Sequence, residues 1–395
     1  MALLVLGRLE LFALSGPRVV VVPQLQIALR SEPQFSEREK KSLKKTPFLP
    51  TNKIFIWSMR DERIRLAWVI LCIGLGTGVA ANFSACDSRR EVWVYSSLSP
   101  EILEELVDPL QAAVPDADVR WYQSSSEGLA TRLNSELQLG KMRADLVMLG
   151  DPSWFLEKKK EGLFQPVESD ALRAIPEADR DRDQQFVTVK RTLAVIAYAD
   201  SAHPTELPET WKDLIQPKFM AKLSLSIPFD SALSWFLFAQ LSQAYGWEYV
   251  AELKKLRAVV EGSQNSVLGR IRSGERPLGV VPLEAIFRPT GKGIPIRWVQ
   301  PKDGLVSVPT LMAVLKDAPH PEQAKKIMDW FISAQAQTLL ATHGALPVLP
   351  KVAPPIGVRL ELSSEKAVVQ PIPMGPELPR LRDRTRAKFS EVFLH

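Results

Sequence analysis

The side chains that most often carry out chemistry are few and scattered in this sequence. The four histidines lie far apart, and none stands at metal-ligand spacing from another: His203, His320, His343 and His395. The His-Glu-x-x-His motif of zinc peptidases and the Gly-x-Ser-x-Gly elbow of serine hydrolases are both missing. The sequence therefore predicts no catalytic residues, no metal and no cofactor. A Ser-His-Asp triad assembled only in space is the alternative that remains open.

Both cysteines, Cys72 and Cys86, belong to an export-like segment. Three arginines between Met59 and Arg65 precede 20 uncharged residues (66–85), which end in Asn-Phe-Ser-Ala before Cys86. This order resembles a lipoprotein signal peptide at 59–85 with its lipobox, in which the cysteine is acylated and becomes the first mature residue. We expect lipidation at Cys86. A single transmembrane helix is the alternative interpretation of the apolar run.

Residues 1–58 precede this signal and have no role in it. We expect them to be a mis-called start, with translation beginning at Met59, or a disordered extension. They also carry the charge imbalance: residues 1–65 hold 12 Lys/Arg and 6 Asp/Glu, which leaves residues 86–395 with a net charge of −1. The overall charge of +5 therefore gives no support to nucleic-acid binding.

The rest of the chain has the pattern of an α/β protein. Strand-like runs at 91–95, 118–122 and 145–149 alternate with helical periodicity, which predicts a parallel sheet covered on both faces. A second unit follows, with strands at 223–227 and 278–281 and a helix at 232–244. Longer runs at 186–198 and 306–315 are candidates for strands that cross between the units, and 321–340 is strongly helical. Ligands of such sheets bind beyond the carboxyl ends of the strands.

Polar residues follow several of these predicted strands. Ser97 and Ser99 come after the first strand, Ser126 after the second and Asp151 after the third. Any one of these serines could be a helix cap or turn residue. Their shared position at strand ends favours a binding site for the set.

Six short motifs occur in an order that resembles an extracellular solute-binding protein of an ABC importer, in the branch that includes ferric-iron-binding and phosphonate-binding proteins. The motifs are Val94-Tyr-Ser-Ser, Ala144-Asp-Leu-Val, Pro208-Glu-Thr-Trp-Lys-Asp-Leu, Gly274-Glu-Arg-Pro-Leu-Gly-Val, Pro301-Lys-Asp-Gly and His320-Pro-Glu-Gln-Ala. The likeness runs from about residue 91 to residue 350.

This resemblance implies a two-lobed periplasmic-binding-protein fold, with two mainly parallel sheets joined by crossing hinge strands and closing on a ligand. We expect a tether at 86–90, a first lobe at 91–190 completed by part of 305–395, and a second lobe at 191–304 with the hinge crossings. A C-terminal tail and helix would occupy 351–395.

The resemblance also implies a set of ligand-binding residues in the second lobe. Ser231-Ala232, expected at a helix start, and Asn265-Ser266, expected before the next helix, match positions that hold the anion accompanying iron. Helix N-termini suit phosphate, phosphonate or carboxylate. The adjacent tyrosines of the ferric branch map near Glu284, and the chain has no adjacent tyrosines. Glu284 would meet a ligand ammonium group or be an exposed strand-end charge.

We therefore expect a lipid-anchored monomer on the periplasmic face of the inner membrane that delivers a small anionic or zwitterionic solute to an ABC permease. Asp87, directly after the lipidated cysteine, resembles an inner-membrane retention signal. The alternatives are an exported α/β enzyme and a lipoprotein of the same fold with a sensory role.

Overall fold

The computed structural model describes residues 89–200, 207–229, 231–287, 295–363 and 367–395. The predicted signal at 59–85, its cysteine Cys86 and the segment 1–58 lie outside these residues. No helix within the described ranges is both long and apolar enough to cross a membrane.

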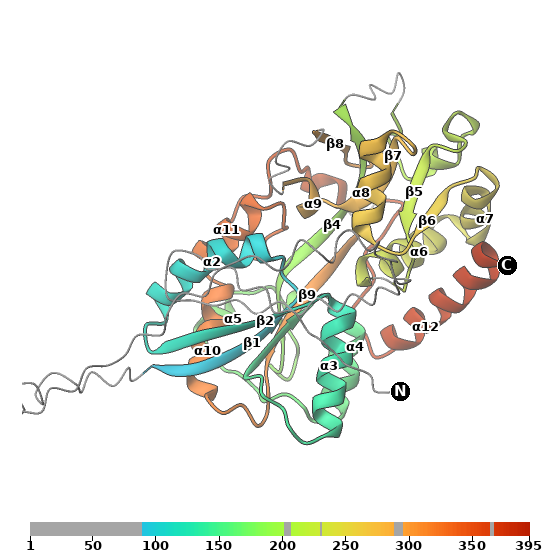
Figure 1. Ribbon diagram of the computed structural model, residues 1–395. Coiled ribbons are helices and arrows are strands. Elements are labelled where there is room, and N and C mark those ends of the chain that lie inside the picture. Colours follow the sequence, from blue (N-terminus) through green and yellow to red (C-terminus); the bar gives the residue numbers. More distant parts are fainter. Residues whose placement is uncertain (1–88, 201–206, 230, 288–294, 364–366) are drawn as a thin grey trace, which may run out of the picture. The chain divides into compact units, whose positions relative to one another are not determined.

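The first half of the described chain builds one sheet (Figure 1). Its parallel strands are β2 (Ala117–Gln123), β1 (Arg90–Ser96) and β3 (Leu146–Leu149), in that spatial order. Alternate residues of these strands enter two different cores, since Val94 and Leu146 pack in one and Tyr95 and Val147 in the other. The sheet is therefore buried on both faces, as the continuous apolar strands predict.

A second sheet contains the parallel strands β7 (Leu278–Pro282), β5 (Leu223–Ser226) and β6 (Val259–Glu261). The edge strand β8 (Ile296–Val299) completes this sheet through antiparallel pairing with β4 (Val187–Ala199). Ile196 and Val280 pack in one core and Val195 and Val281 in another, so this sheet too has two buried faces.

Two strands connect the sheets. β4 pairs with β9 (Ser307–Val314) through its first half, and with β7 and β8 through its second half. β9 in turn pairs with β3 of the first sheet. We call β4 and β9 the hinge strands. The predicted fold class, two mainly parallel sheets joined by crossing strands, is confirmed.

Helices cover both sheets (Figure 1). Those that follow strands of the first sheet are α2 (Pro100–Ala113), α3 (Ser126–Gln138), α4 (Pro152–Lys160) and α5 (Asp170–Arg173). The second sheet carries α6 (Ala232–Tyr245), α7 (Trp247–Lys255), α8 (Gln264–Ser273) and α9 (Glu284–Phe287). After β9 come α10 (Pro321–Phe331), α11 (Ala334–Thr342) and α12 (Leu378–Phe389).

The prediction that 321–340 is strongly helical is confirmed. Two helices share this stretch, because Ser333 has extended backbone and accepts the Ala336 N–H as the N-cap of α11. A serine at this position competes for the backbone N–H groups and starts a new helix.

Candidate functional site

The carboxyl ends of the parallel strands of both sheets lie at the same part of the hinge strands. β3 ends at Leu149, which pairs with Leu311 of β9, and Leu311 pairs with Thr188 of β4. From the other direction, β7 ends at Pro282, which pairs with Ala194 of β4. The strand ends of the two sheets therefore meet along residues 188–194 of β4, where this class of sheet binds ligands.

Ser126 and Asp151 lie together on the first-sheet side. Ser126 begins α3, and its hydroxyl accepts the Gly150 N–H at 3.1 Å, which joins the loops after β2 and β3. Asp151 is the N-cap of α4, and its Oδ1 accepts the N–H groups of Ser153 at 3.0 Å and Trp154 at 3.4 Å. The structure thus brings together two predicted residues that are 25 positions apart in the sequence.

The side chain of Asp151 is only 6% exposed. Burial raises its pKa to about 6, against the attraction of Arg382, whose Nη1 lies 3.9 Å from Asp151 Oδ2. Nearby Glu127 raises this pKa further. Asp151 is therefore close to its titration point at neutral pH.

Ser97 and Ser99 are less closely associated with this group. Ser99 stands at the N-cap position of α2, yet its side chain makes no cap bond, and its hydroxyl is buried without a hydrogen-bond partner among the described residues. Ser97 is half-buried, and its backbone N–H donates to Met148 O at 2.9 Å. No contact in the described part of the chain joins either hydroxyl to Ser126 or Asp151.

On the second-sheet side, Ser234 connects the N-terminus of α6, where Ser231 is the cap, to the N-terminus of α8. As the N-cap of α6, Ser231 accepts the Ser234 N–H, and the two hydroxyls are 3.0 Å apart. Gln264, the first residue of α8, donates its amide to Ser234 Oγ at 3.2 Å. The Ala232 side chain is buried in the core, so only its backbone could reach a ligand.

Asn265 and Ser266 were expected directly before a helix, and this is wrong. The N-cap is Ser263, whose hydroxyl accepts the Ser266 N–H at 3.1 Å, so α8 already begins at Gln264. Asn265 and Ser266 consequently lie inside its first turn, and both are exposed.

Glu284 is not the exposed strand-end charge that was one of its two interpretations. Its side chain is 11% exposed, and Oε1 accepts from Lys190 Nζ at 2.6 Å and from Thr192 Oγ1 at 2.7 Å. Lys190 and Thr192 lie in β4, at the meeting point of the strand ends. Both predicted acids therefore face a basic side chain: Glu284 faces Lys190, and Asp151 faces Arg382.

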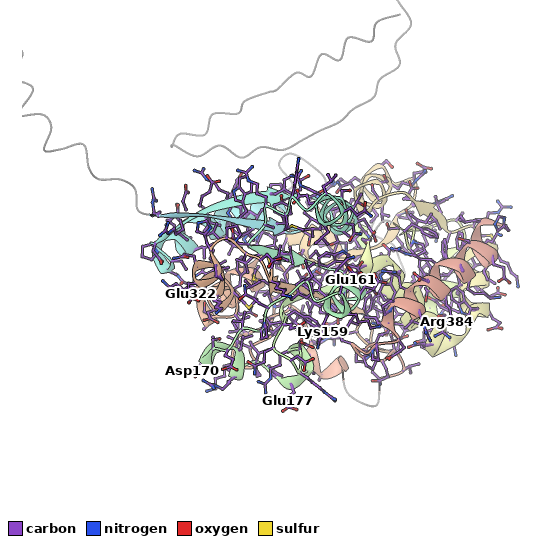
Figure 2. All side chains as sticks on the ribbon, turned by 90° about the horizontal axis from the view of Figure 1, so that it is seen from below. Lys159, Glu161, Asp170, Glu177, Glu322 and Arg384 are labelled. Carbon is purple, nitrogen blue, oxygen red and sulfur yellow. The ribbon has the colours of Figure 1, made fainter. Side chains whose placement is uncertain are left out.

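Helix α12 brings two further basic side chains to the strand ends. Arg386 Nη2 lies 2.7 Å from Glu127 Oε1 of α3, and its Nε donates to Pro228 O, after β5, at 2.9 Å. Arg386 thus contacts loops of both sheets, while Arg382 approaches Asp151 of the first. Arg384, labelled in Figure 2, lies on the exposed face of the same helix. No sequence motif indicates these arginines, which lie in the predicted C-terminal tail and helix at 351–395.

Three tyrosine hydroxyls are engaged in hydrogen bonds, and two of these tyrosines, Tyr245 and Tyr249, are neighbours with ring centroids 5.2 Å apart. Tyr95 donates to Glu136, Tyr245 donates to Asp303, and Tyr249 donates to Trp211 O. Within the described ranges, no three His, Cys, Asp or Glu side chains lie close enough to hold a metal ion.

A cavity of about 640 Å³ lies elsewhere, beside the edge strand β8. Trp298, Lys302 and Arg359 contribute to its wall, and none of the predicted residues does. Lys302 pairs there with Glu209 at 2.6 Å, and both side chains are at least half exposed. We place the candidate site at the strand ends rather than in this cavity, because buried and paired charges gather only at the former.

Sequence comparison identifies similar proteins. The family described as bacterial extracellular solute-binding protein matches residues 142–364. A protein of Salmonella paratyphi A described as a "putative 2-aminoethylphosphonate-binding periplasmic protein" is 24% identical over 248 residues, which cover 60% of this chain and 71% of the relative. The iron uptake protein A1 of Synechocystis is 24% identical over 290 residues, or 67% of this chain and 77% of the relative.

Among solved structures, the substrate-binding protein of an ABC transporter from Agrobacterium tumefaciens superposes with a TM-score of 0.68. It is 19% identical, and the match covers 78% of this chain and 96% of that one. This similarity extends the shared fold over both sheets.

Proposed function

The chain belongs to the family of bacterial extracellular solute-binding proteins, and we propose that it captures a small zwitterionic solute for an ABC importer. One observation carries the choice of solute: where the strand ends of the two sheets meet, buried and half-buried acids and bases face one another. Lys190 lies against Glu284, Arg382 against Asp151, and Arg386 against Glu127. A solute with one anionic group and one ammonium group can pair with a basic side chain and with an acidic side chain at the same time.

The helix N-termini support an anionic group on the solute. α6 and α8 both begin at this end of the second sheet, and Gln264 of α8 is hydrogen-bonded to Ser234 of α6. Backbone N–H groups and partial positive charge at helix starts favour phosphate, phosphonate or carboxylate. A relative named for 2-aminoethylphosphonate, which is a zwitterion, agrees with this choice.

Another relative is named for iron uptake, and the donor groups here argue against ferric iron as the solute of this chain. Hard anionic oxygens are the ligands that ferric iron prefers. Among the described tyrosines, the hydroxyls of Tyr95, Tyr245 and Tyr249 already donate to other groups. We accordingly propose binding without a metal and without catalysis.

A binding assay tests the solute. Purified protein is titrated calorimetrically with 2-aminoethylphosphonate, ethylphosphonate, ethanolamine and ferric citrate, and native mass spectrometry identifies any co-purified molecule and the oligomeric state. We expect 2-aminoethylphosphonate to bind most tightly, to a monomer. Preferred binding of ferric citrate, or of ethanolamine over the phosphonates, would overturn the proposal.

Ser231 and Asn265 provide the matched variants. Removing a hydrogen bond to a charged group costs about 1.5–3 kcal/mol, so each alanine variant should weaken binding roughly 10- to 100-fold. Ser231→Ala should also lower stability by about 1 kcal/mol, because Ser231 caps α6. Asn265 is exposed and is not the cap, so Asn265→Ala should leave stability unchanged. Unaltered affinity in both variants would mean that the assigned helix starts do not contact the solute.

We further propose that the protein is lipid-anchored through Cys86 on the periplasmic face of the inner membrane, where it can dock on its permease. The charge-free run before Cys86 and the acidic Asp87 after it support this proposal. Cys86→Ser should abolish incorporation of a fatty-acid probe. Continued labelling of that variant would contradict lipidation at Cys86. Recovery of the parent protein chiefly in outer membranes would contradict the inner-membrane location.

A further inference from the structure

A buried ion pair between Lys190 and Glu284 links the first half of hinge strand β4 to the end of β7. The two residues are 94 positions apart, and Lys190 Nζ lies 2.6 Å from Glu284 Oε1. Lys190 as a whole is 4% exposed, and the Glu284 side chain is 11% exposed. Thr192, two residues further along β4, is within hydrogen-bond distance of both charged groups, at 3.0 Å from Nζ and 2.7 Å from Oε1.

The pair stands on the same side of the first sheet as the loop that holds Ser126. Residues directly opposite one another in an antiparallel ladder project to the same face, and Lys190 is opposite Thr310 of β9. A Cβ atom at Gly150 would lie 3.6 Å from Thr310 Oγ1 and 3.5 Å from Ser126 Oγ. Ser126, Thr310 and Lys190 therefore place polar side chains on the same side of the first sheet.

Each member of the pair has hydrogen-bonding capacity to spare. An ammonium group has three N–H donors, and Lys190 uses two of them on Thr192 and Glu284. Glu284 accepts both of its bonds at Oε1, and Oε2 has no partner in the described part of the chain. The pair thus offers one free donor with positive charge next to one free acceptor with negative charge.

Stability alone is a weak reason for such a pair. Removing two charges from water costs about as much as their attraction returns, and well-packed apolar residues often stabilise a buried position at least as well. The pair lies where the two sheets meet and has one free donor and one free acceptor, which suggests a role in recognition of the solute.

We propose that the Lys190–Glu284 pair determines specificity for zwitterions: Lys190 binds the anionic group of the solute, and Glu284 binds its ammonium group. This inference rests on the proposed function and adds Lys190, which no motif indicates. Because one pair recognises both charges at a fixed separation, it selects an aminophosphonate over either half of the molecule alone.

The test separates recognition from structure with three variants: Lys190→Met, Glu284→Gln, and the exchange Lys190→Glu with Glu284→Lys. Each is titrated with 2-aminoethylphosphonate and with ethylphosphonate, which lacks the amine, and its thermal unfolding is recorded. Arg384→Gln, on the exposed face of α12, is the control and should match the parent in all measurements.

We expect Lys190→Met to weaken binding of both phosphonates by roughly 10- to 100-fold. Glu284→Gln should weaken 2-aminoethylphosphonate by a similar factor and leave ethylphosphonate nearly unchanged, so that discrimination between them is lost. The exchange variant keeps a pair of opposite charges, so it should recover much of the thermal stability lost in the single variants without recovering affinity.

Two outcomes would overturn the assignment while leaving the proposed function intact. One is a Glu284→Gln variant that still discriminates between the two phosphonates as the parent does. The other is an exchange variant that regains both stability and affinity, which would make the pair purely structural. If the parent binds only ferric citrate, the proposed function is wrong, and the zwitterion assignment falls with it.

Discussion

Replacing Asp151 by asparagine should stabilise the protein at pH 8 and change its stability little near pH 4. The folded-state pKa of Asp151 is about 6, against an ordinary value of 3.8, because the carboxyl group is buried. A raised pKa means that the folded protein holds the proton more tightly than the unfolded chain. The stabilising contribution of the protonated group is therefore complete below about pH 4 and is lost as the pH rises through 6.

The size of the effect follows from the shift. About two pKa units at 1.36 kcal/mol each correspond to about 3 kcal/mol lost between pH 4 and pH 7. Asparagine stays neutral at every pH and keeps the Oδ1 acceptor that caps Ser153 and Trp154. The raised pKa already includes the opposing attraction of Arg382, whose Nη1 lies 3.9 Å away, so we expect the variant to be more stable by up to about 3 kcal/mol at pH 8.

Urea unfolding followed by tryptophan fluorescence between about pH 4 and pH 8 measures this difference. Asp151→Ala serves as the control, because it removes the cap as well and should cost about 1 kcal/mol even at low pH. The reasoning is refuted if Asp151→Asn is less stable than the parent at pH 8. A difference between the two proteins that does not vary with pH would refute it equally.

Three further results are expected. Gly304→Ala should lower stability by about 1–3 kcal/mol in urea unfolding, since Gly304 has φ 141° and a Cβ there would clash with Val369 O; an unchanged midpoint would contradict this. Phe389→Ala should cost about 3–5 kcal/mol because the ring is fully buried 4.6 Å from Phe238, and a loss under about 1 kcal/mol would show that α12 is not part of the core. Titration with ferric citrate should give no visible tyrosinate band; a band would mean that Tyr122 or Tyr198 reaches the iron, or that Tyr95, Tyr245 or Tyr249 leaves its present partner.

Most of the fold followed from local patterns. Apolar runs at 91–95 and 145–149 predicted β1 and β3, and Ser231 before an apolar stretch predicted the start of α6, all within one or two residues. These features depend on neighbours in the chain, through strand-forming side chains and helix capping, so they are visible in the sequence. The motif order likewise predicted a solute-binding protein, and the family match confirms it.

Local patterns gave the wrong helix start where two possible N-cap residues lie within a few positions of each other. Ser263 and Asn265 are both acceptable N-caps, and the structure uses Ser263, whose hydroxyl reaches the Ser266 N–H. The short strands β6 and β8 were also missed, because three or four residues carry little periodicity and their pairing with β5 and β4 decides their conformation.

The sequence by itself thus determined the longer strands and helices, the family, and the serines and acids at strand ends. Only the tertiary structure decided which charges meet there. Lys190 reads as one polar residue in a β-rich run, and Arg386 as one of many charges near the C-terminus, until folding places them against Glu284 and Glu127. The physical reason is that a buried charge is tolerated only with a partner, and chain positions 94 and 259 residues apart are matched by packing, which no local pattern encodes.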